Sequence, residues 1–271
     1  MPAGKAVPLP LHLFTNLFAF AMRILVLPLL LFFAVLFAAC DKSSDTPATP
    51  DFADVALVFE HTVNGQPLVY SSKQYVNAAG DSFSVELLRY YVTNAVLLRE
   101  DGGEVALHNY DLIDPAKPAS CQILTDSVPN GHYTGLRFFL GVDSVRNHTG
   151  LQDGDLDPVY GMTWNWSTGY IFFKHEGRFT NAQGEDQGLI FHLGTDKALT
   201  TINIPFPGGL HVESAARKVY FNFDLGRLYA QPNVIDFNED NYRQSITAAD
   251  RIWLANMKLN MPGAFAFGRV E

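Results

Sequence analysis

Apolar and polar positions alternate along much of the chain from residue 54 onward. Val55, Leu57 and Phe59 stand at every second position, which is the period of a strand with one buried face. Segments rich in β-branched and aromatic residues predict further strands at 84–99, 105–110, 133–142, 169–176, 188–193, 200–204 and 218–225. Turn residues such as Asn64-Gly65 separate nearly all of them. The pattern predicts an all-β fold, an antiparallel β-sandwich of immunoglobulin-like or related type.

Two short helices are expected near the C-terminus, at 236–245 and 247–257. Thr247 is placed to cap the second of them. The region 54–271 contains no linker and no internal repeat, so we expect a single domain.

The first 39 residues have the pattern of an export signal. The stretch 24–39 is apolar except for Pro28, Arg23 stands before it, and Ala38-Ala39-Cys40 ends it with small residues and a thiol. We predict cleavage before Cys40, lipid on that cysteine, and a flexible polar tether over 40–53. An uncut transmembrane anchor is the alternative, but the stretch is short for a span of about 20 residues. Met22, directly before this pattern, is the better candidate initiator.

Composition narrows the classes of function for the mature chain. Without Lys5 and Arg23, 17 basic residues remain against 28 acidic ones, a net charge of −11 that argues against nucleic-acid binding. After lipidation of Cys40, Cys121 is the one cysteine left, so no disulfide can form within the chain. The sequence holds none of the motifs HExxH, GxSxG, CxxCH or a Walker loop, and we predict a protein that is not an enzyme.

The candidate chemistry lies between residues 141 and 194. Met162, Trp164 and Trp166 alternate, so an extended chain would point all three side chains to one face. His192 stands on the predicted strand 188–193. Taken singly, such tryptophans and such a histidine are more often core residues than ligands.

The chain resembles the MbnP-like family of exported copper-binding proteins, named for a partner in the methanobactin copper system. The matching pieces follow one another over nearly the whole mature domain. They are Phe59-Glu60-His61 with Gly65; Tyr75-Val76-Asn77 with Gly80; 88–94 (LRYYVTN) with Asp101-Gly102; Gly141-Val142-Asp143; 161–166 (GMTWNW) with Gly169-Tyr170; and Phe191-His192-Leu193-Gly194.

The resemblance implies copper binding outside the cytoplasm, at the periplasmic face or the cell surface. In that family a di-haem peroxidase-like partner oxidises a tryptophan to kynurenine, which helps to form the site. The resemblance makes His192 the first ligand candidate, with Met162 and His61 as further ligands. Trp164 or Trp166 would be the kynurenine precursor. Imidazole and thioether suit copper(I), and imidazole suits copper(II).

Two other functions stay open at this point. A non-metal surface-binding or adhesion module could share the sandwich and use exposed aromatic residues as its binding face. A hydrolase is a weaker alternative. Among the remaining histidines, His175 is expected at the surface end of a strand, and His148 in a polar turn. His108, His132 and His211 are expected in hairpins or loops without partners, and Cys121 in a loop.

Overall fold

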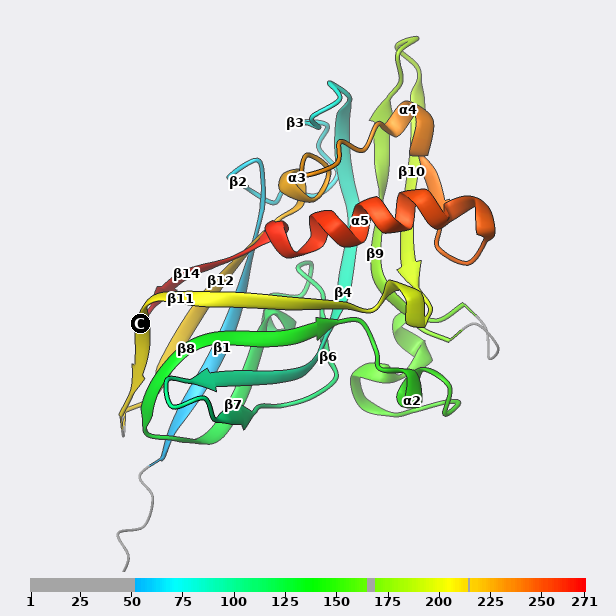
Figure 1. Cartoon of the computed structure of the whole chain (residues 1–271). Helices are drawn as coiled ribbons and strands as arrows, with labels where there is room; N and C mark the ends of the chain where they lie inside the picture. The colour runs from blue at the N-terminus through cyan, green and yellow to red at the C-terminus, as the bar shows by residue number, and fades with distance from the viewer. Residues whose placement is uncertain (1–51, 165–168, 214) are drawn as a thin grey trace, which may run out of the picture. The chain divides into compact units, whose positions relative to one another are not determined.

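The computed structural model describes residues 52–164, 169–213 and 215–271 (Figure 1). Residues Pro50–Glu271 form one compact unit built on two β-sheets, to which the described residues belong. No helix in these ranges is long and apolar enough to cross a membrane.

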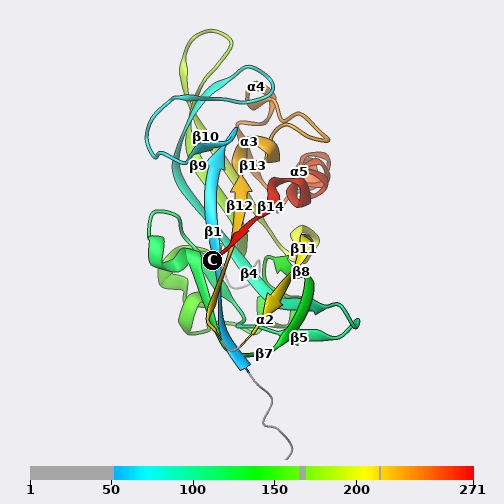
Figure 2. The same ribbon diagram turned by 90° about the vertical axis from the view of Figure 1, so that its left-hand side faces the viewer.

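The first sheet, here called sheet A, has the strand order β14-β12-β1-β2, with β7 also paired to β1. Its strands are β1 (Phe52–Val63), β2 (Gln66–Pro67), β7 (Gln122–Pro129), β12 (Arg217–Asp224) and β14 (Phe265–Val270). Figure 2 shows β1, β12 and β14 side by side.

The second sheet, sheet B, has the order β11-β8-β4-β9-β10-β13, with three short strands also paired to β4. The strands on the main path are β4 (Ser82–Arg99), β8 (Gly131–Leu140), β9 (Ile171–Thr180), β10 (Asp186–Gly194), β11 (Thr200–Val212) and β13 (Tyr242–Gln244). The short ones are β3 (Tyr75–Val76), β5 (Glu104–Ala106) and β6 (Asp111–Ile113).

The helices are short, apart from one. They are α2 (Ser144–Asn147), α3 (Leu225–Leu228), α4 (Phe237–Asp240) and α5 (Arg251–Ala264), with 3-10 turns at Pro118–Cys121, Gly154–Leu156, Pro158–Tyr160, Asp196–Ala198 and Ala248–Asp250. α5 packs against α3, and its Trp253 ring lies 5.3 Å from that of Phe191 on β10.

The core lies between the two sheets and is rich in aromatic residues. Val55, Leu57 and Phe59 of β1 are buried as their alternation predicts. Phe59 packs edge-on against Phe138 of β8, with ring centroids 6.0 Å apart, and so joins sheet A to sheet B. The two sheets therefore form a β-sandwich without a disulfide among the described residues, where Cys121 is a free, buried thiol.

Three expectations need correction. The sandwich is not purely antiparallel, because β1 pairs with β12, and β10 with β13, in parallel. The helix expected at 236–245 is confirmed only over its first part, since α4 ends at Asp240 and the chain then adds β13 to the edge of sheet B. The second helix is confirmed but runs further, to Ala264, after a capping box formed by Thr247 and Asp250. The immunoglobulin-like arrangement stays a prediction.

Candidate functional site

The two faces of sheet B carry different chemistry where β4, β9 and β10 run side by side. The register places His192 opposite Lys174, and Phe191 opposite His175. Because successive strand residues point to opposite faces, His192 and Lys174 lie on one face while Phe191 and His175 lie on the other. The face with Phe191 meets the aromatic core, and we call the face with His192 the outer face of sheet B.

His192 is held on the outer face by a carboxylate. Its Nε2 lies 2.9 Å from Oε1 of Glu176, and its Nδ1 is 3.4 Å from the amide nitrogen of Gln244. Lys174 approaches the same Glu176 oxygen at 3.3 Å. Burial lowers the pKa of His192, against the opposing effect of Glu176, so the imidazole is neutral near pH 7.

Glu176 in turn is ionised near neutral pH. Burial alone would raise its pKa, but the hydrogen bond from His192 and the charge of Lys174 lower it overall. A carboxylate that binds one imidazole nitrogen fixes the ring and leaves the other nitrogen as the stronger donor, the arrangement found behind many metal-bound histidines.

Trp164 lies against Gly194, the last residue of β10. A Cβ added to Gly194 would come within 2.5 Å of two carbons of the Trp164 ring, so the indole rests directly on this glycine. Gly194 is two residues beyond His192 on β10 and shares its face, which separates the two positions by roughly 7 Å along the strand. The buried indole nitrogen of Trp164 has no hydrogen-bond partner among the described residues. A pocket of about 200 Å³ adjoins the indole, with Asn147 and Tyr170 in its wall.

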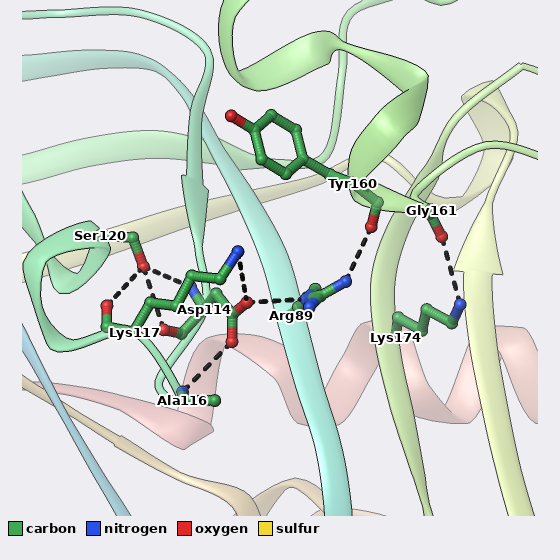
Figure 3. A network of polar contacts seen from close by, with 8 residues as sticks. All are labelled: Arg89, Asp114, Ala116, Lys117, Ser120, Tyr160, Gly161 and Lys174. Atoms are coloured by element: carbon green, nitrogen blue, oxygen red, sulfur yellow. Dashed lines mark hydrogen bonds and ion pairs between the residues drawn. The ribbon is translucent and has the colours of Figure 1, made fainter.

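Two basic side chains, those of Arg89 and Lys174, hold the segment that contains Trp164 against sheet B (Figure 3). Arg89 of β4 donates to the carbonyl of Tyr160 at 2.7 Å, and Lys174 of β9 donates to the carbonyl of Gly161 at 3.2 Å. Arg89 also pairs with Asp114 at 2.9 Å. Met162 follows this anchor directly; it is fully buried and its carbonyl accepts from the backbone N–H of Ile171.

His61 belongs to a second cluster, between the sheets. Its Nε2 lies 2.9 Å from the hydroxyl of Tyr90, and burial lowers its pKa to about 4. His61 lines a cavity of about 550 Å³ that Tyr70 and Cys121 also line. Burial raises the pKa of the Cys121 thiol to about 11, so it is protonated at neutral pH.

The structure does not bring His61 and His192 together. Tyr90, the partner of His61, is opposite Phe173 and therefore lies on the core face of sheet B. His192 lies on the outer face, so the sheet separates the two imidazoles. Among the candidates, Trp164 contacts β10 at Gly194, two residues from His192. His192 itself is held by Glu176, a residue that the sequence pattern did not single out. Glu176 lies on β9, diagonally opposite His192 on the neighbouring strand β10. The register of these two strands brings the residues together, and their spacing along the chain does not predict it.

The other histidines depart from their expected surroundings. His175 lies in the middle of β9 and is fully buried, not at a surface strand end; its Nδ1 is 2.6 Å from the hydroxyl of Tyr229. His132 and His211 have a partner after all, because their rings stack on one another across two strands. His148 is exposed as expected and lies 3.1 Å from Asp196, and His108 lies 2.6 Å from Asp111.

Several predicted features fall outside the described residues. They are the signal peptide over 1–39, Cys40, most of the tether over 40–53, and Trp166. Within 52–164, 169–213 and 215–271, no group of three or more His, Cys, Asp or Glu side chains is arranged to hold a metal ion. His192 and Glu176 therefore need a further donor to complete a metal centre.

Comparison with known proteins agrees with the resemblance seen in the sequence. The profile of the family described as MbnP matches residues 52–248. Among solved structures, MbnP from Methylosinus trichosporium is similar at 15% identity, covering 68% of this chain and 79% of that chain, with a TM-score of 0.49. No curated protein matches. The family match spans both sheets and contains His61, Trp164, Glu176 and His192, and the chain therefore belongs to the MbnP family.

Proposed function

We propose that this protein binds copper outside the cytoplasm, at the outer face of sheet B, through His192 and a kynurenine made from Trp164. The observation that carries the proposal is the contact of the Trp164 indole with Gly194, two residues beyond His192 on β10. Family membership supports copper as the metal, since the chain is an MbnP protein.

The described residues fit such a centre in part. His192 is neutral and oriented by Glu176, which leaves Nδ1, bonded only by the long contact from Gln244, as the nitrogen to bind a metal. No described residue accepts a hydrogen bond from the buried indole nitrogen of Trp164, and the same is true of Trp253. Bound copper would supply a redox-active, soft ion that accepts nitrogen and oxygen donors.

Conversion of Trp164 would provide the donors that the unmodified site lacks. Oxidative cleavage of the indole C2–C3 bond adds two oxygen atoms and gives N-formylkynurenine, and hydrolysis then releases formate. The product carries an aromatic amine and a ketone, both polar, where the indole had one N–H. We propose a di-haem peroxidase-like protein as the source of oxidising equivalents.

The other sequence candidates have different parts in this proposal. Met162 is fully buried. We assign it a structural role, in which it stabilises the anchored segment, and not the role of a copper ligand. His61 lies on the far side of sheet B and is left out of this centre. For Trp166 the structure supplies no position, and we choose Trp164 because its contact with Gly194 is known.

Isothermal titration with copper(I) under reducing conditions tests the proposal, on protein produced together with its modifying partner. We expect tight binding by the wild type and an intact mass about 4 Da above the sequence mass, from the atoms exchanged. His192→Gln should abolish tight binding, and Trp164→Phe should abolish both binding and the mass shift. His148→Ala is the matched control, because His148 is an exposed histidine paired to a carboxylate elsewhere.

Two results would contradict this assignment. Unchanged copper(I) binding by His192→Gln would remove the central ligand. Loss of binding in His61→Ala, with His192→Gln unaffected, would move the site to the cavity between the sheets.

A further inference from the structure

Two exposed histidines face each other on the edge of sheet B, far along the chain from one another. His132 on β8 and His211 on β11 are direct cross-strand neighbours. Their rings are stacked, with centroids 4.2 Å apart and an angle of 9° between the planes. Both side chains are exposed, and that of His211 is 51% accessible.

We propose that His132 and His211 form a surface chelate for a divalent transition-metal ion, separate from the centre around His192. Imidazole nitrogen suits Zn(II), Ni(II) and Cu(II), and of these Cu(II) is bound most tightly by a given set of nitrogen donors. The site takes the ion alone, with water completing its coordination.

The geometry meets the first requirement of a chelate. Each metal–nitrogen bond is about 2 Å, so two imidazole nitrogens on one ion lie about 3 to 4 Å apart. The ring centroids are only 4.2 Å apart, so both imidazoles are within reach of a single ion. In the stacked arrangement their in-plane lone pairs run side by side, and the proposal requires both exposed side chains to change their χ angles on binding, which turns the lone pairs toward a common point.

The charges around the pair favour a cation. Glu213, two residues after His211, places a carboxylate oxygen 3.5 Å from its Nδ1. Arg99, a basic residue at the end of β4, is already paired with Asp101 and lies over the ring of Tyr133, whose side chain points to the opposite face from that of His132.

The pairing depends on a bulge in β11. The register of β8 with β11 shifts between Pro205 and Leu210, where Gly208 and Gly209 both have positive φ. Without the shift, continuation of the Pro205↔Gly135 register would place Gly208 opposite His132. The bulge instead brings His211 there, so only the folded sheet forms the chelate, and metal binding must stabilise the folded state.

Binding of Ni(II), Cu(II) and Zn(II) to the full chain without a polyhistidine tag tests the proposal. We expect the wild type to bind one ion at the pair and to melt at a higher temperature in its presence. His132→Ala and His211→Ala should each weaken binding at least about tenfold, since each removes one of two protein ligands. Electron paramagnetic resonance of the Cu(II) form should show two coupled nitrogens in His192→Gln, which lacks the proposed copper ligand, and one when His132→Ala or His211→Ala is added to it.

The controls separate this site from the other histidines. His108→Ala and His148→Ala remove exposed histidines that pair with carboxylates and should leave Ni(II) binding unchanged. His192→Gln should also leave it unchanged, so failure of the copper centre would not affect this result. The proposal is overturned if either His132→Ala or His211→Ala binds Ni(II) as the wild type does.

Discussion

Three histidines of the domain are held in surroundings that disfavour a protonated imidazole. His61 and His175 face the core, and burial lowers their pKa values to about 4 and about 3. His192 is also shifted down, although Glu176 partly compensates. In His175 the proximity of His192 adds to the effect of burial. Near pH 7 all three rings are therefore neutral, the form in which a histidine binds metal or accepts a hydrogen bond.

The depressed pKa of His175 predicts that acid weakens the fold. In the unfolded chain this histidine takes up a proton near its ordinary pKa of 6.5, whereas in the folded chain it does so only near 3. Its contribution to stability is therefore complete above pH 6.5 and is lost as the pH falls toward 3. In His175→Phe/Tyr229→Phe, the free energy of unfolding should vary with pH less steeply, by about 1.4 kcal/mol per pH unit in this window.

Denaturant titrations at a series of pH values would measure that slope. Tyr229→Phe alone is the matched control, because it removes the phenol but keeps the buried imidazole. Equal slopes in the double variant and in this control would show that His175 does not carry the pH dependence.

Strand alternation in the sequence correctly predicts that Val55, Leu57 and Phe59 are buried. The surface position expected for His175 is wrong, because it rests on the polar neighbours at 174 and 176 and not on alternation. Those neighbours lie on the outer face while His175 points into the core, as alternation itself requires. The stacking of His132 on His211 could not be predicted, because a bulge decides which residue of β11 faces His132.

Among the larger elements, the connection between β8 and β9 depends most on long-range polar contacts. Arg89 and Lys174 hold its Tyr160 and Gly161 carbonyls against sheet B, as Figure 3 shows. Arg89 also neutralises Asp114, whose side chain is only 5% accessible. Arg89 therefore holds two connections against β4. One of them contains Asp114, and the other contains Trp164.

Removing this arginine should destabilise the domain. Arg89→Met removes the close charge partner of the buried Asp114 carboxylate and leaves only Lys117, whose ammonium lies 3.9 Å away, so we expect a loss of about 3 kcal/mol in the free energy of unfolding. Arg89→Met/Asp114→Asn should regain part of that loss, because no uncompensated charge remains. Urea unfolding of the two variants measures the difference. A double variant no more stable than the single one would show that the contact with Tyr160 matters more than the charge of Asp114.

At the scale of the whole molecule, periodicity and turn residues predict two packed sheets, and family resemblance points to the residues around His192. Neither of them shows which pairs of neighbouring strands run parallel and which run antiparallel. β13 joins the edge of β10 in parallel through only three residue pairs, and the sequence 236–245 has helix-like features that this edge contact overrides. Glu176 joins the candidate site only through sheet register, which no local pattern encodes.

We predict that the cellular placement of the molecule depends on Cys40, which lies before the described domain. We expect Cys40→Ser to prevent lipid attachment, because the thiol is the acceptor in the predicted lipoprotein signal. Growth with a radioactive fatty acid should label the wild type and leave the variant unlabelled, and fractionation should find the variant away from its normal membrane. Equal labelling of both proteins would contradict lipidation at this cysteine.

The parallel pairing of β1 with β12 has a consequence for biogenesis. Val55 pairs with Arg217, and Thr62 pairs with Asp224. Strand β1 therefore cannot complete its sheet until β12, one of the last strands of the domain, has been made. Contacts between such distant parts of a chain make folding slow. During synthesis, β1 therefore emerges without its parallel neighbour and has no stable native position. For the export predicted from the first 39 residues, we infer that this delay keeps the chain extended while it is threaded through a secretion channel, and that sheet A is completed only after nearly the whole domain has emerged on the far side.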